Sequence, residues 1–181
     1  MSRPTSTAAS SQAEAGFRFV GSRVFTSSGY VVVGKKAYQA VPPEGAAAVL
    51  RAFVTGSHVT NSDVTVEEAR VSAQAVAFTL ASRVAALEAS VGAQRAFAFT
   101  SASVLLVYDA HPHARPSPSV TQSAAQSAAQ SVAQSAEVRL IDLAHVRCGG
   151  EVDESSCFGL GRLSNLLADV HADLGAASRR A

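Results

Sequence analysis

The stretch VRLIDLAHV, residues 138–146, decides how this chain is interpreted. It is a run of apolar, β-forming residues that carries one carboxylate, Asp142, between Ile141 and Leu143. An unpaired carboxylate in an apolar environment costs on the order of several kcal/mol. A strand with such a residue therefore neutralises it, hydrogen-bonds it or supplies a cation, and the remaining sequence indicates which of these applies.

The size and charge of the chain predict one intracellular domain. The 181 residues are enough for a proper core, because a chain of about 150 residues buries roughly 70% of its unfolded surface. A net charge of +1 without a dense Lys/Arg block indicates no nucleic-acid partner and no acidic membrane. No stretch approaches the roughly 18 apolar residues of a membrane span. We expect the cytoplasm, the nucleus or both, with Cys148 and Cys157 reduced.

Two low-complexity segments bound and interrupt the expected domain, residues 16–177. The opening MSRPTSTAASSQA has no apolar signal core, and a disordered tail over residues 1–15 is favoured over a transit peptide. Residues 110–136 contain prolines and then a repeated Gln-Ser-Ala-Ala tetrad. A four-residue stripe drifts about 40° per repeat on a helix and offers no large side chain. We therefore expect this insert to be disordered, or a loosely attached helix, outside the core.

The first half of the domain predicts a hairpin and two helices. GFRFVGSRVFTSSGYVVVG has two β-rich runs around a turn at residues 27–29. VPPEGAAAVLRAFVTG then places prolines at a helix start and Gly56 at its end. In the next segment Thr65 and Glu68 have the spacing of a capping box, which predicts a long helix that ends near Gly92. Its apolar face repeats at three- and four-residue steps: Ala69, Ala73, Val76, Leu80, Val84 and Leu87.

The second half predicts strands and a closing helix. FAFTSASVLLVYDA is a strand whose continuous apolar stretch, residues 104–107, indicates burial on both faces. CFGLGRLSNLLADV predicts an amphipathic helix with Phe158, Leu160, Leu163, Leu166, Leu167 and Val170 on its apolar face. This mixture of hairpin, helices and separate strands predicts an α+β fold.

Few residues suggest chemistry by spacing alone. Cys148 and Cys157, with His145 and His171 nearby, match neither a Cys-x-x-Cys pair nor a zinc-finger histidine pair. His111 and His113 lie in the proline-rich insert. The sequence contains no Gly-rich phosphate loop, nucleophile elbow or His-Glu-x-x-His pair. From the Ile-Asp-Leu tripeptide alone, a carboxylate capped by local N–H groups is the favoured interpretation of Asp142.

Four short motifs in order change that interpretation: GFRFVGSRVF, SASVLLVYD, VRLIDLAHV and FGLGRLSNLL. Together they resemble the C-terminal portion of the inositol polyphosphate kinase family, which includes the multikinases and the inositol hexakisphosphate kinases. The family's Ser-Leu-Leu is similar to the tripeptide that begins at Ser103, and its Tyr-Asp to Tyr108 and Asp109. Its Ile-Asp-Phe is similar to the tripeptide centred on Asp142.

The resemblance implies an ATP-dependent inositol polyphosphate kinase fold, with antiparallel strands and flanking helices. It implies that Asp142 lies at a strand end and binds the Mg²⁺ that bridges the phosphates of ATP, since Mg²⁺ takes one or two carboxylates with phosphate oxygens. It also implies that His145 contacts a phosphate of the inositol ring. A hydrogen-bonded residue on the exit loop is the alternative for His145.

Two features that the resemblance implies do not occur in the 181 residues: the N-terminal lobe that binds adenine, and the motif that contains the catalytic Asp and Lys. The family's catalytic Asp and Lys lie in a Pro-x-x-x-Asp-x-Lys-x-Gly motif ahead of Gly-Phe-Arg, and the only lysines here, Lys35 and Lys36, are in no such motif. They fall near the family's Gly-Arg-Ser-Leu segment, which is not recognisable. We expect the chain to begin after the catalytic motif, so no catalytic residue is assigned. Two functions stay open: a kinase that needs an N-terminal lobe, and a non-catalytic remnant that binds inositol phosphates or a protein.

The resemblance predicts one arrangement in space. Residues 104–108 and 138–142 should be neighbouring antiparallel strands. The helix around residues 67–87 should pack beside them, and residues 122–136 should lie outside the core.

Overall fold

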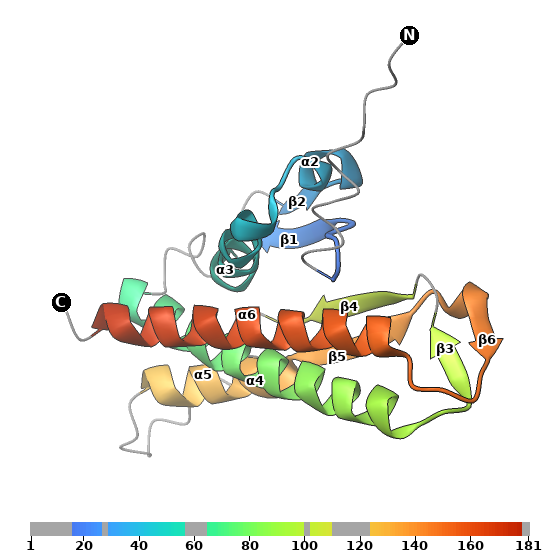
Figure 1. Cartoon of the computed structure of the whole chain (residues 1–181). Helices are drawn as coiled ribbons and strands as arrows, with labels where there is room; N and C mark the ends of the chain where they lie inside the picture. The colour runs from blue at the N-terminus through green and yellow to red at the C-terminus, as the bar shows by residue number, and fades with distance from the viewer. Residues whose placement is uncertain (1–15, 27–28, 57–64, 100–101, 110–123, 179–181) are drawn as a thin grey trace, which may run out of the picture.

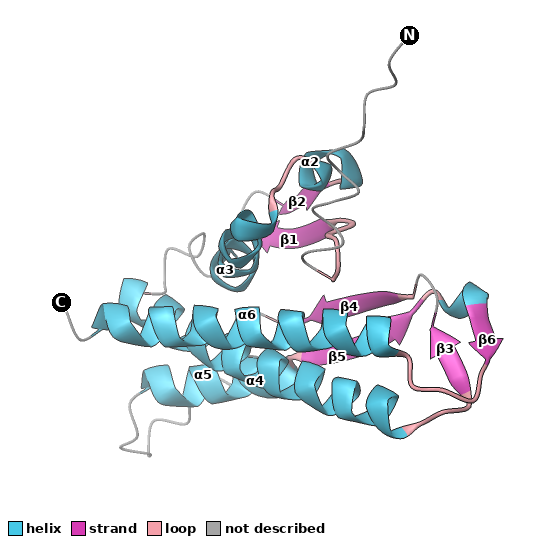
Figure 2. Cartoon of the chain, viewed as in Figure 1, coloured by secondary structure: helices cyan, strands magenta, loops and turns pink. Residues whose placement is uncertain are grey.

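The molecule, a computed structural model, combines two long helices and several shorter ones with three small antiparallel sheets in the part of the chain that the structure describes (Figures 1 and 2). The structure describes residues 16–26, 29–56, 65–99, 102–109 and 124–178. Its helices and strands are β1 (Ser22–Thr26), β2 (Gly29–Val33), α2 (Lys35–Gln39), η1 (Pro43–Gly45), α3 (Ala46–Gly56), α4 (Val66–Ala93), β3 (Phe97–Phe99), β4 (Ser103–Val107), α5 (Ala124–Ser135), β5 (Glu137–Ile141), η2 (Leu143–His145), β6 (Val146–Cys148) and α6 (Glu154–Ser178). The predicted α+β class is confirmed.

The start of α4 follows from local sequence. The Thr65 hydroxyl accepts a hydrogen bond from the Glu68 N–H at 3.2 Å, and the Glu68 carboxylate accepts one from the Thr65 N–H at 2.9 Å. These reciprocal bonds satisfy two N–H groups that a helix start leaves unpaired. The predicted capping box is confirmed, and the helix ends at Ala93, one residue after Gly92.

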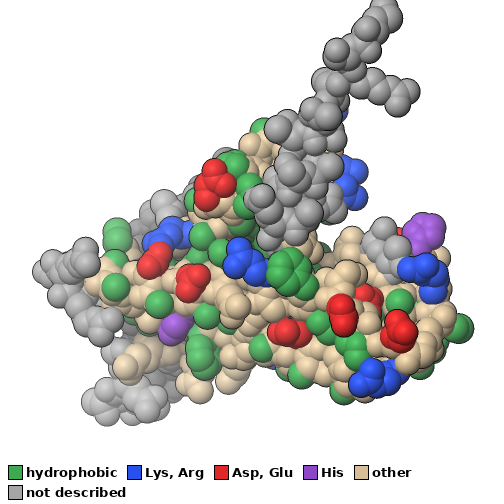
Figure 3. Space-filling model, viewed as in Figure 1, with side chains coloured by type: hydrophobic (Ala, Val, Ile, Leu, Met, Phe, Trp, Pro, Cys, Tyr) green, Lys and Arg blue, Asp and Glu red, His purple; other side chains and the backbone are tan. Residues whose placement is uncertain are grey.

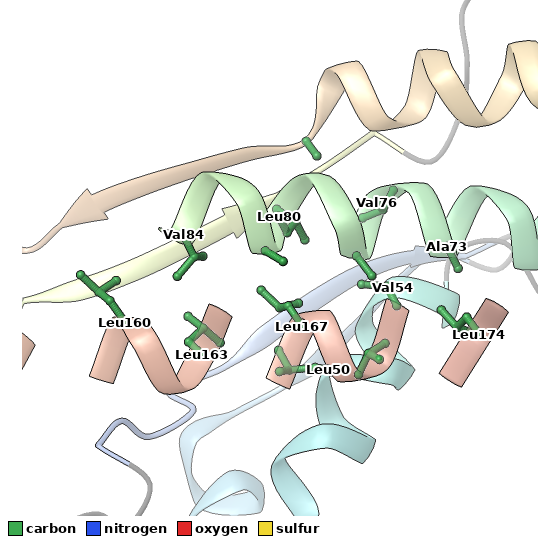
Figure 4. Packing of buried hydrophobic residues seen from close by; sticks show 14 of the residues in the cluster. Leu50, Val54, Ala73, Val76, Leu80, Val84, Leu160, Leu163, Leu167 and Leu174 are labelled. Atoms are coloured by element: carbon green, nitrogen blue, oxygen red, sulfur yellow. The ribbon is translucent and has the colours of Figure 1, made fainter. Parts of the chain in front are cut away.

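The core lies between α4 and α6, whose apolar side chains point toward one another (Figure 4). On α6 the buried side chains recur at three- and four-residue steps, which is the period of one helix face. Phe158 was predicted on this face but is 51% exposed, because it lies about 200° around the helix from Leu160. The buried positions of α6 are Leu160, Leu163, Leu167, Val170 and Leu174.

Helix α4 is also long and apolar enough, by length and composition, to cross a membrane. Core helices pass the same test, and Val76, Leu80 and Val84 of α4 are fully buried inside the molecule. Buried residues make up 33% of the 18-residue window that meets this test, so packing in the core accounts for part of the apolar character of α4.

The expectation that residues 122–136 lie outside the core is wrong for the part that the structure describes. Helix α5 packs along α4, and Ala129, Val132 and Ala136 are 4%, 1% and 0% exposed. The reason is steric: alanine and serine let two helix backbones approach closely. Val132 replaces an alanine in the repeated tetrad and fills the remaining space in the core. Residues 110–123 fall outside the described part of the chain.

Replacing Val132 by Asp should therefore lower the free energy of unfolding by about 3 kcal/mol or more, because it leaves an unpaired charge in the core. Urea unfolding followed by circular dichroism measures the loss. The exposed Gln130 of the same helix is the matched site, and Gln130→Asp should change stability by less than about 0.5 kcal/mol. Equal effects of the two substitutions would show that α5 is not a core helix.

Strands β4 and β5 pair antiparallel, with Ser103 opposite Ile141 and Val107 opposite Glu137. The predicted pairing of these segments is confirmed, as is their packing beside α4. The predicted burial of β4 on both faces is wrong, since Leu105 and Val107 are 43% and 45% exposed. A ribbon of two strands covered by helices on one face buries only alternate residues.

Strands β1 and β2 form the predicted hairpin, which lies with α2 and α3 in a smaller unit beside α6 (Figure 1). Gly29 has φ of 111°, a conformation that glycine adopts without steric cost. The predicted short helix corresponds to α3. Tyr108 directly follows β4, and its hydroxyl donates a hydrogen bond to the Phe53 carbonyl of α3 at 2.7 Å. This bond joins the smaller unit to the β4–β5 ribbon.

Candidate functional site

Asp142 follows the last residue of β5 and has an unusual backbone. Its φ and ψ are 58° and 55°, the left-handed region, and it is the only non-glycine residue with positive φ in the described ranges. Aspartate tolerates this region better than most residues, but the conformation still costs about 1 kcal/mol or more. Backbone strain of this kind concentrates at functional sites, so it marks Asp142 as a candidate.

The side chain of Asp142 is exposed rather than buried. It makes no capping hydrogen bond to η2, and no described residue forms a hydrogen bond or ion pair with it. The interpretation of Asp142 as a carboxylate capped by local N–H groups is therefore wrong. The expectation that the Asp142 carboxylate lies in an apolar environment is also wrong, because the residue is exposed. As an exposed residue, Asp142 is accessible to a ligand.

The other two predicted site residues lie close to Asp142 along the chain or across the ribbon. Ser103 opens β4 and pairs with Ile141, the residue before Asp142. His145 ends η2, the single turn that leads from Asp142 into β6, and is exposed. The structure thus places Ser103, Asp142 and His145 at one end of the β4–β5 ribbon. We call this end of the ribbon, with η2, the strand-end site.

A residue that the sequence reasoning missed supports the strand-end site. Asp153 precedes α6, is 8% exposed, and its carboxylate accepts hydrogen bonds from the Phe99 N–H at 2.6 Å and the Ser156 N–H at 3.1 Å. The hydroxyls of Ser155 and Ser156 donate to the same carboxylate at 3.0 and 2.8 Å. An Asp just before a helical run is a helix-start signal, so the capping role was detectable in the sequence.

Through Phe99, Asp153 holds the strand pair that follows the site loop. Phe99 of β3 pairs with Val146 of β6, the residue directly after His145. The hydrogen bond from the Phe99 N–H therefore fixes β3 and β6 to the start of α6. Because η2 is bounded by β5 and β6, anchoring β6 restricts the positions that His145 can take.

The charge of Asp153 is stabilised despite its burial. Burial by itself raises the pKa of this carboxyl, but hydrogen bonds from the backbone of Phe99 and Ser156 and from the two serine hydroxyls lower it below its usual range. Asp153 is therefore ionised at neutral pH. With four hydrogen bonds to its oxygens, it is a structural anchor and is not available to bind a ligand.

The remaining chemical candidates of the sequence have structural roles or none. The His171 ring lies 5.4 Å from the Phe78 ring, and its Nδ1 is 3.1 Å from the Gln74 carbonyl. Cys148 is exposed and Cys157 is half-buried; burial first, and then the nearby carboxylates of Glu88, Asp153 and Glu154, raise the pKa of the Cys157 thiol. A raised pKa makes a thiol a poor nucleophile. His111 and His113 fall outside the described residues.

The strand-end site fits only a metal ion that takes most of its ligands from water and phosphate. Within the described ranges, no group of three or more His, Cys, Asp or Glu side chains could hold a metal ion. A zinc or calcium site built from protein ligands alone needs such a group. Mg²⁺ instead keeps several waters and binds through one or two carboxylates together with phosphate oxygens. The exposed carboxylate of Asp142 fits an ion that arrives with a phosphate ligand.

Comparison with known proteins identifies a family and a similar fold. The family model described as inositol polyphosphate kinase matches residues 3–168. A solved structure described as "Structural Studies and Protein Engineering of Inositol Phosphate Multikinase" has a TM-score of 0.56 at 18% identity, with 93% of this chain and 74% of that chain covered. At that identity the likeness shows the fold. No curated protein matches the chain.

Proposed function

Because this chain belongs to the inositol polyphosphate kinase family, we propose that it forms the magnesium- and phosphate-binding part of an ATP-dependent inositol polyphosphate kinase. One observation carries the proposal: Asp142 is held in a strained backbone conformation with its carboxylate exposed and unpartnered in the described part of the chain. A purely structural residue at this position would be served as well by Gly or Asn, which adopt the left-handed region without a charge.

In this proposal Asp142 and His145 of the strand-end site would bind different ligands. Mg²⁺ bound with ATP would reduce the repulsion between the ATP phosphates and a polyanionic inositol phosphate. Asp142 would hold the ion through its exposed carboxylate. His145, at the far end of η2, would donate a hydrogen bond from its ring to a phosphate of the inositol. Asp153 would keep His145 in place through β3 and β6.

A second function, binding without phosphoryl transfer, is favoured by a specific observation. The 181 residues contain no Pro-x-x-x-Asp-x-Lys-x-Gly segment, and the only lysines, Lys35 and Lys36, lie on α2. Charge stabilisation and positioning supply most of the rate enhancement in phosphoryl transfer. We therefore propose that these 181 residues bind inositol phosphates and the Mg²⁺-bound phosphates of ATP, and that transfer requires the family's N-terminal lobe with its Asp-x-Lys segment.

The test measures binding and transfer separately. Isothermal titration of the 181-residue chain with ATP plus Mg²⁺, and with a panel of inositol phosphates, reports binding. Labelled ATP then reports transfer, with and without a chimaera that supplies the N-terminal lobe with its Asp-x-Lys segment. Transfer by the chimaera alone supports the proposal. Binding with transfer in neither protein supports the non-catalytic function, and absence of binding to either ligand contradicts both.

Replacing His145 by Ala should weaken the binding of inositol phosphates by roughly 10- to 100-fold, the worth of a hydrogen bond to a charged group. The affinity for ATP with Mg²⁺ should change little, because that interaction is assigned to Asp142. Isothermal titration with both ligands measures the two effects. His171→Ala is the matched control: it removes a packed histidine of α6 and should lower stability without changing either affinity. Equal losses for both ligands in His145→Ala would remove the role given to this side chain.

A further inference from the structure

The β1–β2 hairpin has one face on which all four described side chains are exposed. Its other face contains Val24, which lies near Gly56 of α3, and Val31, which is 50% exposed. On the open face Phe25 pairs with Tyr30, and Arg23 pairs with Val32. Phe25, Tyr30 and Val32 are 47%, 58% and 67% exposed. We call these four residues the open hairpin face.

The side chains of the open hairpin face are arranged in contact. The rings of Phe25 and Tyr30 meet edge to face with centroids 5.1 Å apart. The guanidinium carbon of Arg23 lies 3.7 Å above the centre of the Tyr30 ring. Both contacts are favourable by about 0.5–1.5 kcal/mol at such sites, so the apolar and cationic groups form one surface.

Charge in the sequence is divided unevenly, although the net charge is only +1. Residues 16–43 contain Arg18, Arg23, Lys35 and Lys36 and no carboxylate, and all four cations are exposed. Residues 44–181 contain thirteen carboxylates against ten Lys and Arg. Figure 3 shows acidic side chains spread along the helical part of the molecule. Residues 16–43 therefore carry a formal charge of +4 (4 − 0), whereas residues 44–181 carry −3 (10 − 13).

The strand register orders these groups along the hairpin. Arg23 and Val32 lie away from the turn, and Lys35 and Lys36 begin the helix that follows β2. Phe25 and Tyr30 lie next to the turn. The open face thus has an apolar, aromatic end and a cationic end.

We propose that the open hairpin face, with Lys35 and Lys36, docks on the surface of a membrane that contains anionic lipids. Exposed Tyr, Phe and Val enter the boundary between headgroups and acyl chains, and nearby Lys and Arg are attracted to anionic headgroups. The near-neutral net charge argued against a membrane, but attraction falls off within a Debye length and depends on local charge.

The same face suits other partners less well. Single-stranded nucleic acid needs an open aromatic ring for base stacking, and one side of the Tyr30 ring is occupied by Arg23. A second copy of the chain would bring two faces of the same positive charge together, which is unfavourable. A membrane with anionic lipids can interact with both ends of the open hairpin face: its headgroups attract the cations, and its interface accepts the aromatic side chains.

The experiment is co-sedimentation of the full 181-residue chain with phosphatidylcholine vesicles, with and without phosphatidylserine, in the absence of ATP and inositol phosphates. Binding should require phosphatidylserine and decline with added salt. Lys35→Gln with Lys36→Gln should weaken partitioning by roughly 30-fold, about fivefold for each charge. Arg83→Gln with Arg95→Gln removes two exposed charges elsewhere and should weaken it far less. Tyr30→Ser should weaken it with unchanged salt dependence.

Several results would overturn the proposal. They are equal binding to vesicles without phosphatidylserine, equal losses in the two double variants, and competition by free inorganic phosphate that exceeds the effect of sodium chloride at the same ionic strength. Tighter binding to a single-stranded RNA oligomer, blocked by the same Lys35 and Lys36 substitutions, would assign the face to nucleic acid instead. Since no kinase ligand is present, failure here leaves the proposed function untouched.

Discussion

Asp142→Asn is expected to abolish magnesium-dependent binding of ATP while leaving the free energy of unfolding within about 0.5 kcal/mol of the parent. Asn accepts the left-handed conformation of this position as readily as Asp does, so the backbone keeps its geometry. It lacks the charge that holds Mg²⁺. The loss should exceed the roughly 10- to 100-fold that supporting residues around a metal are worth. Isothermal titration over a series of Mg²⁺ concentrations, beside urea unfolding, measures both quantities.

Two controls separate the charge of Asp142 from its backbone conformation. Asp142→Gly relieves the φ of 58° and removes the carboxylate, and it should lose binding as fully as Asp142→Asn. Asp169→Asn makes the same chemical change at an exposed position of α6 and should change neither binding nor stability. If Asp142→Asn unfolds the protein, or leaves ATP affinity within a few fold of the parent, Asp142 is structural and the ion is bound elsewhere.

Asp153→Ala is expected to lower the free energy of unfolding by about 2–4 kcal/mol. It removes a helix cap, worth about 0.5–2 kcal/mol, and leaves the Phe99 N–H without its acceptor, which costs about 1–3 kcal/mol more. Urea unfolding measures the change. Asp153→Asn should lose less, because its amide oxygen still accepts a hydrogen bond. Glu154→Ala, at the next and exposed position, should stay within about 0.5 kcal/mol of the parent.

The contribution of Asp153 should also depend on pH in a defined direction. Its pKa in the folded protein is lowered, so it lies below the value of about 3.9 in an unfolded chain. The charge therefore stabilises the fold above about pH 4, and this stability is lost as the pH falls through the folded-state pKa. The difference between the parent and Asp153→Asn should be large near neutral pH and shrink in acid.

The comparison with a variant is needed because other carboxyls titrate in the same range. A hydrogen bond from Arg70 lowers the pKa of Glu67, and the backbone N–H of Thr65 lowers that of Glu68. Both are present in the parent and in the variant, so their effect cancels in the difference. A difference that stays constant from neutral to acid pH would show that the Asp153 charge does not contribute.

Features that depend on neighbours in the sequence were predicted correctly. The capping box of α4 joins Thr65 to Glu68, three residues apart, and the hairpin turn lies between strands that are adjacent in the chain. Strands β4 and β5 are separated in the sequence by a long insert. Their pairing was nevertheless predicted, because family motifs identify both strands. The position of Asp142 at the end of a strand followed from the same motif.

The accessibility of Asp142 and the role of Asp153 were not predicted. Whether a strand-end carboxylate is buried depends on what packs over it, and here nothing in the described chain covers Asp142. Asp153 lies before a helical run, so its capping role was readable. Its bond to the Phe99 N–H was not, because that donor lies 54 residues away and is brought close only by folding.

The sequence by itself determined the start of α4 and the β1–β2 hairpin, because hydrogen bonds between near neighbours specify them, and its family motifs supplied the candidate residues of the strand-end site. Only the tertiary structure decided which apolar surfaces are covered. The sequence pattern predicted that Leu105 and Val107 are buried, but both are exposed. It predicted that the small residues of α5 lie outside the core, but they pack in it. The physical reason is that burial is a property of two surfaces: a side chain leaves water only where another element of matching shape reaches it.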